Sequence, residues 1–165
     1  MINEKIEKAF NRQITEEIDS MYLYLSMSAW FESINFTGMA SWMNIQAKEE
    51  WAHAMKFYGN IIERGGRVKF DKIDAPKHEW SSPLDAFENA YKHECHISKC
   101  IDDLYKLAED EGDRPAQVFL NWFIEEQVEE EASTDAVVQK LKMVKDSTNG
   151  LFMLDKALSQ RADGK

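Results

Sequence analysis

Four long segments of this sequence carry apolar residues at steps of three and four, the spacing that places side chains on one face of an α-helix. The segments cover roughly residues 1–35, 38–64, 83–111 and 115–145. At about 1.5 Å per residue, each helix would be about 40–50 Å long. Long helices with one apolar face must bury that face against one another. The pattern therefore restricts the chain to a helical bundle.

The connections between these segments indicate how the bundle is threaded. Residues 35–38 and 112–115 are short breaks that contain glycine, whereas residues 67–82 lack helical periodicity and are long enough to cross a bundle. Short connections make neighbouring helices antiparallel. We therefore predict an all-α fold, an antiparallel four-helix bundle over about residues 3–145. It has one long crossover between its second and third helices and forms a single domain of residues 1–165.

Residues with special backbone or capping properties mark the ends of the predicted helices. Thr37 is a candidate N-cap for the second helix, and Gly65-Gly66 ends it. Ser82-Pro83 is the pattern of a cap followed by proline at the first helical position. A short amphipathic fifth helix is predicted over about residues 148–159, and residues 160–165 are expected to form a frayed tail.

The charge balance limits the classes of partner. A net charge of −10 argues against nucleic acid and anionic membrane surfaces and favours cations. The first residues do not form a signal peptide, and no apolar run approaches the length of a membrane span. Cys95 and Cys100 are five residues apart on a predicted helix and point in different directions, so we expect two free thiols. These features predict a cytoplasmic protein without a nucleic-acid or membrane partner.

Each apolar stripe is interrupted near its midpoint by a carboxylate. The four glutamates are Glu17, Glu50, Glu94 and Glu130, and His53 lies one turn after Glu50. Buried carboxylates at one depth would repel each other until some of them took up protons, whereas two divalent cations would neutralise all four. Carboxylates with one imidazole suit iron or manganese better than a thiolate-seeking metal, although zinc could still bind. The arrangement predicts a dinuclear metal site.

Several nearby residues have simpler interpretations. A single glutamate in an apolar stripe often extends to water, and the acidic run that includes Glu125 and Glu131 is expected to be a solvated face at those two positions. Trp122 either shields the site or, as we expect, packs in the core. The other histidines have no carboxylate partner at ligand spacing on an inward stripe and are expected at the surface: His78, His93 and His96.

At these positions the chain resembles the bacterial non-haem ferritins. The resemblance covers the whole length, from the four long helices and the crossover to the short fifth helix. A second Glu-x-x-His pair, which is typical of the wider di-iron class, is replaced here by Gln127-x-x-Glu130. That departure separates ferritins from the bacterioferritin and rubrerythrin types. The residues that carry the resemblance are Glu17, Tyr24, Glu49-Glu50-x-x-His53, Glu94 and the segment Glu126-Gln127-Val128-Glu129-Glu130.

The resemblance implies a ligand role for five residues. Glu17, Glu50 and His53 would hold a first iron. Glu50 would bridge to a second iron, which Glu94 and Glu130 would also hold. The site would thus have a histidine on one iron only.

The resemblance also implies roles around the two irons. Gln127 would ligate weakly or orient water or dioxygen, because its amide carries no charge. Tyr24 would donate an electron or a hydrogen bond. Ala52 lies between Trp51 and His53, where bacterioferritins have the methionine that binds haem, so no haem is expected. A third iron site would be formed, with Glu130 shared, by Glu49, Glu126 and Glu129.

The implied function is iron storage and detoxification. A homo-oligomeric hollow shell of 24 subunits would oxidise Fe(II) with dioxygen or peroxide and deposit ferric oxide inside. One alternative is a non-storing di-iron peroxide reductase of rubrerythrin or bacterioferritin type, and another is an interaction bundle without catalytic metal. Five large apolar residues are more than one thin bundle can bury, so some of them are expected at subunit contacts: Trp30, Trp42, Trp80, Met27 and Phe36.

Overall fold

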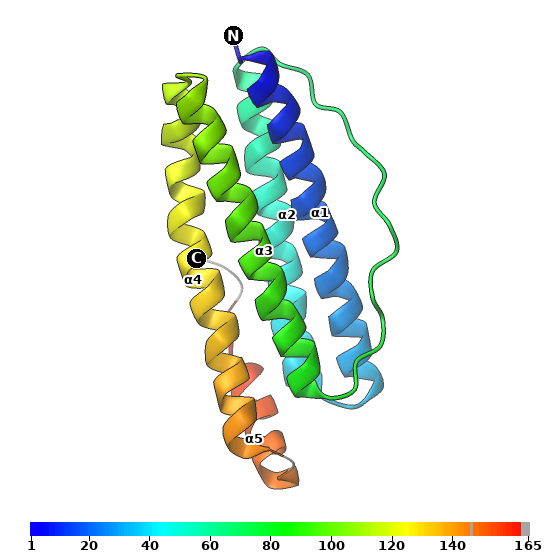
Figure 1. The fold of residues 1–165 in the computed structure, drawn as a ribbon. Coiled ribbons are helices and arrows are strands. Elements are labelled where there is room, and N and C mark those ends of the chain that lie inside the picture. Colours follow the sequence, from blue (N-terminus) through cyan, green and yellow to red (C-terminus); the bar gives the residue numbers. More distant parts are fainter. Residues whose placement is uncertain (146, 163–165) are drawn as a thin grey trace.

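The computed structural model describes residues 1–145 and 147–162, and its regular elements there are five helices without a strand (Figure 1). The all-α fold, the antiparallel bundle and its long crossover are confirmed. Ser82 caps the third helix as predicted, since its hydroxyl accepts a hydrogen bond from the backbone N–H of Asp85 (3.1 Å). In the described part of the chain, no helix combines the length and apolar character that a membrane span requires. The helices are α1 (Glu4–Ser33), α2 (Thr37–Glu63), α3 (Pro83–Asp110), α4 (Arg114–Val144) and α5 (Thr148–Leu158).

The crossover, residues 64–82, runs along the outside of α1 from one end of the bundle to the other (Figure 1). Asn11 of α1 fixes its first part. The Asn11 amide nitrogen donates to the carbonyl of Arg67 (3.0 Å), and its oxygen accepts from the backbone N–H of Lys69 (2.6 Å). A connection without helical hydrogen bonds of its own therefore finds partners on the bundle.

The apolar interior consists of two clusters, one towards each end of the bundle. Phe57 lies at the centre of the first, with its ring 5.0 Å from Phe10 and 4.3 Å from Phe123. Phe31 and Phe87 lie in the second, 5.6 Å apart. Burial of each such side chain contributes about 1.5–3 kcal/mol. The two clusters leave a layer between them for polar side chains.

The expectation that one bundle cannot bury all five of these large apolar residues was wrong for four of them. Trp30, Trp42, Trp80 and Met27 are buried within the chain, and Phe36 is partly buried against the same cluster. The crossover supplies Trp80 to this cluster, and α5 adds leucines to it. The bundle is thicker at this end than four helices alone would make it, which is why it holds these side chains.

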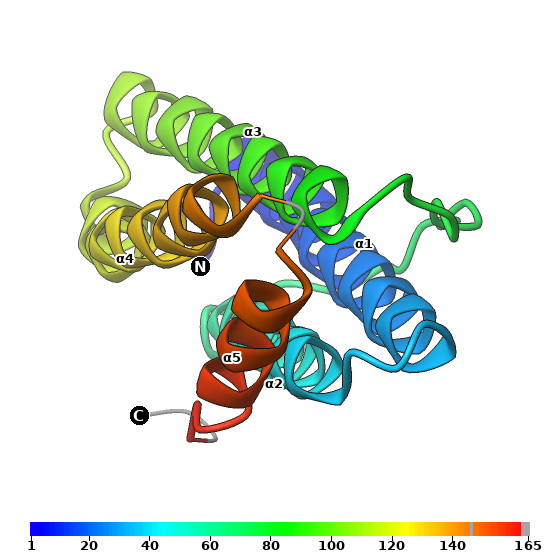
Figure 2. The same ribbon diagram turned by 90° about the horizontal axis from the view of Figure 1, so that it is seen from below.

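The N-terminus of α2 is capped by a distant residue. The predicted cap, Thr37, is instead the first helical residue; the preceding Phe36 makes no side-chain capping bond. Asp155 of α5 accepts the hydrogen bond from the backbone N–H of Met39 (2.8 Å). A helix N-terminus favours a carboxylate, so this contact fixes α5 beneath α2 (Figure 2).

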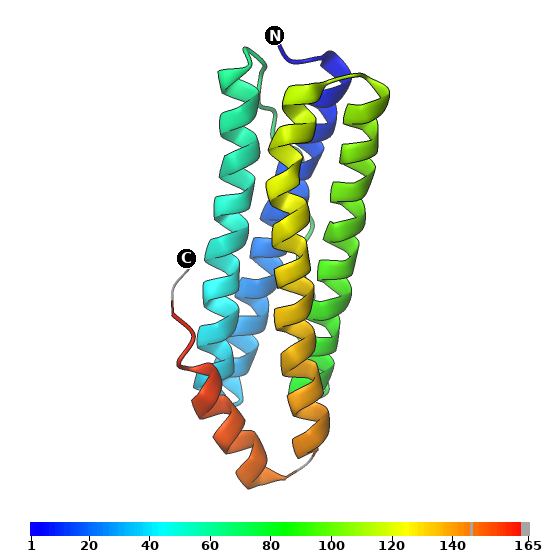
Figure 3. The same ribbon diagram turned by 90° about the vertical axis from the view of Figure 1, so that its left-hand side faces the viewer.

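The segment after α5 turns back beside α2 (Figure 3). Arg161, expected in a frayed tail, lies 4.3 Å above the ring of Trp42. Its guanidinium also donates to Glu49 (2.5 Å) and Gln46 (2.9 Å). Residues 163–165 of the expected tail lie outside the described residues. The chain therefore returns a positive charge to the middle of the bundle.

We predict that Gly38→Ala detaches α5. A methyl group at Gly38 would lie 1.8 Å from the backbone oxygen of Asp155, so the two helices must separate. Overpacking of this kind costs about 1–3 kcal/mol. Hydrogen exchange should show faster exchange over 148–158, together with a lower unfolding temperature.

Gly59→Ala is the matched control, because nothing lies near the added methyl in the same helix. It should leave α5 protected and stabilise α2 by about 0.5–1 kcal/mol. Equal protection of α5 in both variants would contradict the close packing of Gly38 on α5.

Candidate metal centre

A layer of ionisable side chains lies between the two apolar clusters, and all four long helices contribute to it. Glu17 comes from α1, Glu50 and His53 from α2, Glu94 from α3 and Glu130 from α4. Each is at most 4% exposed. The spacing of three between Glu50 and His53 places both on the inward face of α2.

Glu17, Glu50 and His53 form the tightest part of this layer, with one ligand atom of each within 4.8 Å of the others. His53 Nδ1 lies 3.3 Å from Glu50 Oε2 and 3.9 Å from Glu17 Oε2. Glu17 Oε1 accepts a hydrogen bond from Gln13 (2.8 Å), but its buried Oε2 has no hydrogen-bond partner. An unpaired buried carboxylate oxygen beside an imidazole nitrogen fits a cation.

Glu94 is held from both sides by neutral donors. The Tyr24 hydroxyl donates to Glu94 Oε1. The Gln127 amide donates to Glu94 Oε2 (3.2 Å) and has further contacts of 3.3 Å with the Glu94 carbonyl and the Ser98 hydroxyl. Gln127 therefore orients Glu94 without adding charge.

Gln46 connects the second and fourth helices within the layer. Its amide donates to Glu130 Oε2 (2.6 Å) and to Glu50 Oε1 (3.2 Å), and its oxygen accepts from Arg161. Neither Gln46 nor Arg161 was among the residues predicted for the site from the sequence. A glutamine in an otherwise apolar stripe was a usable signal for Gln46, whereas nothing near Arg161 in the sequence points to α2.

The four glutamates hold their protons far more strongly than free carboxylates. Burial is the main cause, and it raises the pKa of Glu17, Glu50, Glu94 and Glu130 to about 8. Repulsion from neighbouring glutamates raises these pKa values further. Burial also raises the pKa of Tyr24 well above that of a free phenol, so it stays a hydrogen-bond donor. Divalent cations would displace these protons and balance the charge of the resulting carboxylates, so the donor set fits them.

A cavity of about 790 Å³ opens beside the layer. His53 reaches it, and its Nε2 lies 3.9 Å from Glu126 Oε1. Trp122 is 36% exposed with its ring 5.4 Å from that of His53, so it covers the site, and the expected core position was wrong. The cavity is lined by all three residues predicted for a third site: Glu49, Glu126 and Glu129.

Those three residues differ in their surroundings. Glu126 forms a compact group with His53 and Glu130, whose ligand atoms lie within 4.8 Å of one another. Glu49 is half-buried and paired with Arg161, and Glu129 is exposed. Glu49, Glu126 and Glu129 thus form an acidic wall of the cavity, which also reaches His53 and Glu130 of the buried layer.

His93 corrects the surface prediction made for the remaining histidines. It is half-buried, bonds to the Ser20 hydroxyl (2.7 Å) and lies 6.1 Å from the Tyr24 ring. Burial, together with nearby His96, lowers the pKa of His93 to about 4, so it is neutral. His78 and His96 are exposed, as predicted. The spacing of residues along α3 could not identify His93 as buried, because the residues that it contacts, Ser20 and Tyr24, belong to α1.

A four-helix bundle whose centre holds glutamates and a Glu-x-x-His pair is the architecture of the ferritin-like di-iron proteins. A family model described as a ferritin-like domain matches residues 7–144. The chain belongs to the ferritin family. The resemblance inferred from the sequence is therefore confirmed.

Individual relatives agree with this assignment. The bacterial non-heme ferritin of Bacteroides fragilis is 46% identical, covering 98% of this chain and all of that protein. The corresponding protein of Staphylococcus epidermidis is 34% identical over 98% of each chain. Among solved structures, an open-pore ferritin of the archaeon Archaeoglobus fulgidus is 47% identical with a TM-score of 0.97, covering 98% of this chain and 100% of that one. A closed form of that ferritin made by mutagenesis has a TM-score of 0.98 at 46% identity, covering 99% of this chain and 100% of that one.

We predict that the metal-free protein loses stability as the pH rises from about 5 to about 8. The four carboxyls have a pKa near 4.5 when unfolded and about 8 when folded, so the folded state binds more protons in this interval. The contribution of these carboxyls to the free energy of unfolding is therefore complete below pH 4.5 and is lost as the pH rises past 8. Over this range the loss should be at least about 2 kcal/mol. Thermal unfolding of chelated protein across this range measures it.

Glu17→Gln is the control, since it keeps the volume and removes one titrating group. Its stability should depend less steeply on pH. A stability that rises with pH in the wild type would contradict the raised pKa values.

Proposed function

We propose that the buried layer is where this ferritin binds and oxidises Fe(II). The chain's family is one of iron-storage proteins with ferroxidase activity, and iron is the substrate and cargo rather than a resident cofactor. The observation that carries the assignment is the concentration of four buried glutamates with raised pKa values around one imidazole, with Glu17 Oε2 unpaired. Two ferrous ions would supply four positive charges to this layer.

The first ferrous ion would bind among Glu17, Glu50 and His53. His53 would use Nδ1, which faces the two carboxylates, while Nε2 faces Glu126. A histidine ligand whose other nitrogen faces a carboxylate is fixed in ring orientation. Glu50 would bridge to the second ion, because its oxygens face different neighbours: Oε2 lies near His53, and Oε1 accepts from Gln46.

The second ferrous ion would bind among Glu50, Glu94 and Glu130. The carboxylates around this ion contact the amides of Gln46 and Gln127 and the phenol of Tyr24, whereas the first ion would have the imidazole of His53. Gln127 is placed to position Glu94, and the Tyr24 hydroxyl donates a hydrogen bond to the same carboxylate. The second ion has no imidazole ligand and only the uncharged Gln127 amide nearby, which makes it easier to release and suits an ion that must move on to storage.

Oxidation removes one electron from each ferrous ion and passes it to dioxygen or peroxide. Hard carboxylate oxygens stabilise the higher charge of Fe(III). Protons released from the glutamates on iron binding leave through the solvent. The rings of Trp122 and Phe123 pack against each other and against the ring of His53, so together they shield this ligand from bulk water.

A third ion would bind on the cavity side, at Glu49, Glu126 and Glu129, with Glu130 shared. The support is the cavity itself, which all of these glutamates line together with His53. Arg161 pairs with Glu49 at its rim, so a cation at this position competes with the guanidinium.

Storage would require assembly, which we propose to be a homo-oligomeric cytoplasmic shell of 24 subunits enclosing ferric oxide. The net charge of −10 would attract Fe(II) to such a shell. Large side chains exposed on the long helices would lie at subunit contacts, including Tyr22, Leu25, Ile62 and Val118.

The test is to add Fe(II) to metal-free protein without oxygen, admit air and follow iron through size exclusion. Wild-type protein should elute as a particle of several hundred kilodaltons that retains iron. Glu50→Ala and Glu130→Ala should each slow oxidation by more than about 100-fold, since even outer partners of a metal ligand are worth 10–100-fold. The exposed Glu125→Ala is the control and should behave as wild type. A small species that consumes peroxide and retains no iron would overturn the storage proposal.

We predict that Glu49→Ala and Glu129→Ala change the rate or stoichiometry of oxidation while two ions per chain still bind. Anaerobic Fe(II) titration separates the two effects, because these residues line the cavity and lie outside the buried layer. Loss of all iron binding in either variant would refute a separate third site.

Arg161→Ala should strengthen binding of the third ion about two- to fivefold, because it removes a partly exposed ion pair worth up to about 1 kcal/mol. Lys156→Ala removes an exposed positive charge from α5 and serves as the control. Equal affinities in the two variants would show that Arg161 does not compete with the cation.

A further inference from the structure

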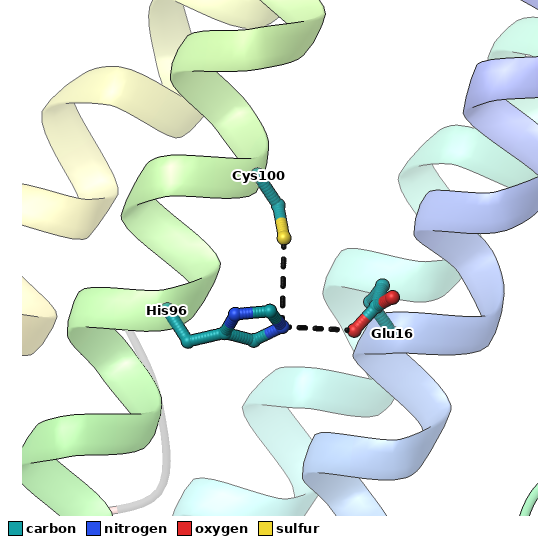
Figure 4. Close-up of side chains that lie close together, drawn as sticks. All are labelled: Glu16, His96 and Cys100. Atoms are coloured by element: carbon teal, nitrogen blue, oxygen red, sulfur yellow. Dashed lines mark hydrogen bonds and ion pairs between the residues drawn. The ribbon is translucent and has the colours of Figure 1, made fainter.

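Three metal-ligating side chains converge between α1 and α3, outside the buried layer (Figure 4). His96 and Cys100 are four residues apart on α3 and therefore share a face. Glu16 of α1 points towards them across the gap between the helices (Figure 4). None of the three takes part in the proposed iron oxidation.

The distances match those between ligands on one small ion. His96 Nε2 lies 3.2 Å from Glu16 Oε2 and 3.6 Å from Cys100 Sγ. In a tetrahedral zinc site, with bonds of about 2.0–2.1 Å to nitrogen or oxygen and about 2.3 Å to sulfur, neighbouring ligand atoms are about 3.3 Å (N and O) and about 3.5 Å (N and S) apart. All three ligand atoms lie within 4.8 Å of one another, so only the Glu16–Cys100 distance has room to shorten.

The surroundings orient the ligands and leave them accessible. Arg12 Nε lies 3.7 Å from Glu16 Oε1, which turns the other carboxylate oxygen towards His96. The side chains of His96 and Glu16 are 53% and 22% exposed, so an ion can arrive from solvent. The neighbouring ring of His93, 6.1 Å from that of His96, is neutral and adds no repulsion.

The donor set selects the kind of ion. A thiolate, an imidazole and a carboxylate together suit Zn²⁺, whereas Mg²⁺ and Ca²⁺ require oxygen ligands. The buried layer, in contrast, offers only oxygen and nitrogen. Burial raises the pKa of the Cys100 thiol to about 11, so without an ion it is not a reactive thiolate. On metal binding its proton would pass to solvent.

We propose that Glu16, His96 and Cys100 form a second metal site, which binds a zinc ion between α1 and α3 with water completing the coordination. The three ligands form a group of their own beside the buried layer and differ from it in ligand chemistry. The site stands whether or not that layer oxidises iron.

Cobalt(II) is the probe for this site, because thiolate coordination gives it a charge-transfer band in the near ultraviolet. Iron-free, assembled wild-type protein with reduced cysteines should develop this band on addition of Co²⁺, and Zn²⁺ should then abolish it. The buried layer contains no sulfur and cannot produce the band. Equilibrium dialysis with Zn²⁺ counts the ions bound per chain.

Cys100→Ser and His96→Gln should each bind one zinc ion fewer per chain or bind it at least about tenfold more weakly, and Cys100→Ser should lack the band. Cys95→Ser is the matched control and should keep both. Circular dichroism verifies helix content, and Fe(II) oxidation should be unchanged in all three. The proposal is overturned if the wild type shows no band, or if the band survives in Cys100→Ser; the three residues would then be only a hydrogen-bonded surface cluster.

Discussion

The burial of four carboxylates at one level of a helical bundle is the constraint on which the rest of this structure depends. Desolvation and mutual repulsion raise the pKa of every one of them to about 8. Such a layer destabilises the metal-free fold, so the apolar clusters on either side must compensate. Closely packed rings such as those of Phe57 and Phe123 supply that compensation without entering the layer. The same unfavourable burial of negative charge would favour the binding of cations in the layer.

The layer is asymmetric, and the asymmetry follows from which residue types face each glutamate. On one side His53 stands between two carboxylates and contributes a second kind of ligand. On the other side Tyr24 and Gln127 hold Glu94 by hydrogen bonds only. Neutral donors lower the cost of burying a carboxylate but do not bind a metal in its place. Two ions in this layer would therefore be held with unequal strength, which favours sequential movement.

Helix periodicity was sufficient to predict the bundle, the crossover and the depth of Glu17, Glu50, Glu94 and Glu130, because these depend on spacing within one helix. Periodicity within one helix could not predict the contacts between helices. The pairing of Asp155 with the start of α2 joins residues 116 positions apart. The burial of the large apolar residues was also predicted wrongly, since their number does not tell whether a fifth helix or another subunit covers them.

The C-terminal segment is connected to the buried layer by a continuous set of contacts. Arg161 donates to Gln46, and Gln46 donates in turn to both Glu50 and Glu130. If Glu50 or Glu130 turns towards a metal ion, Gln46 must exchange one of its acceptors, and its contact with Arg161 is then the one that can adjust. The guanidinium also pairs with Glu49 at the cavity. One arginine therefore connects two parts of the site, since it reaches the buried layer through Gln46 and the cavity through Glu49.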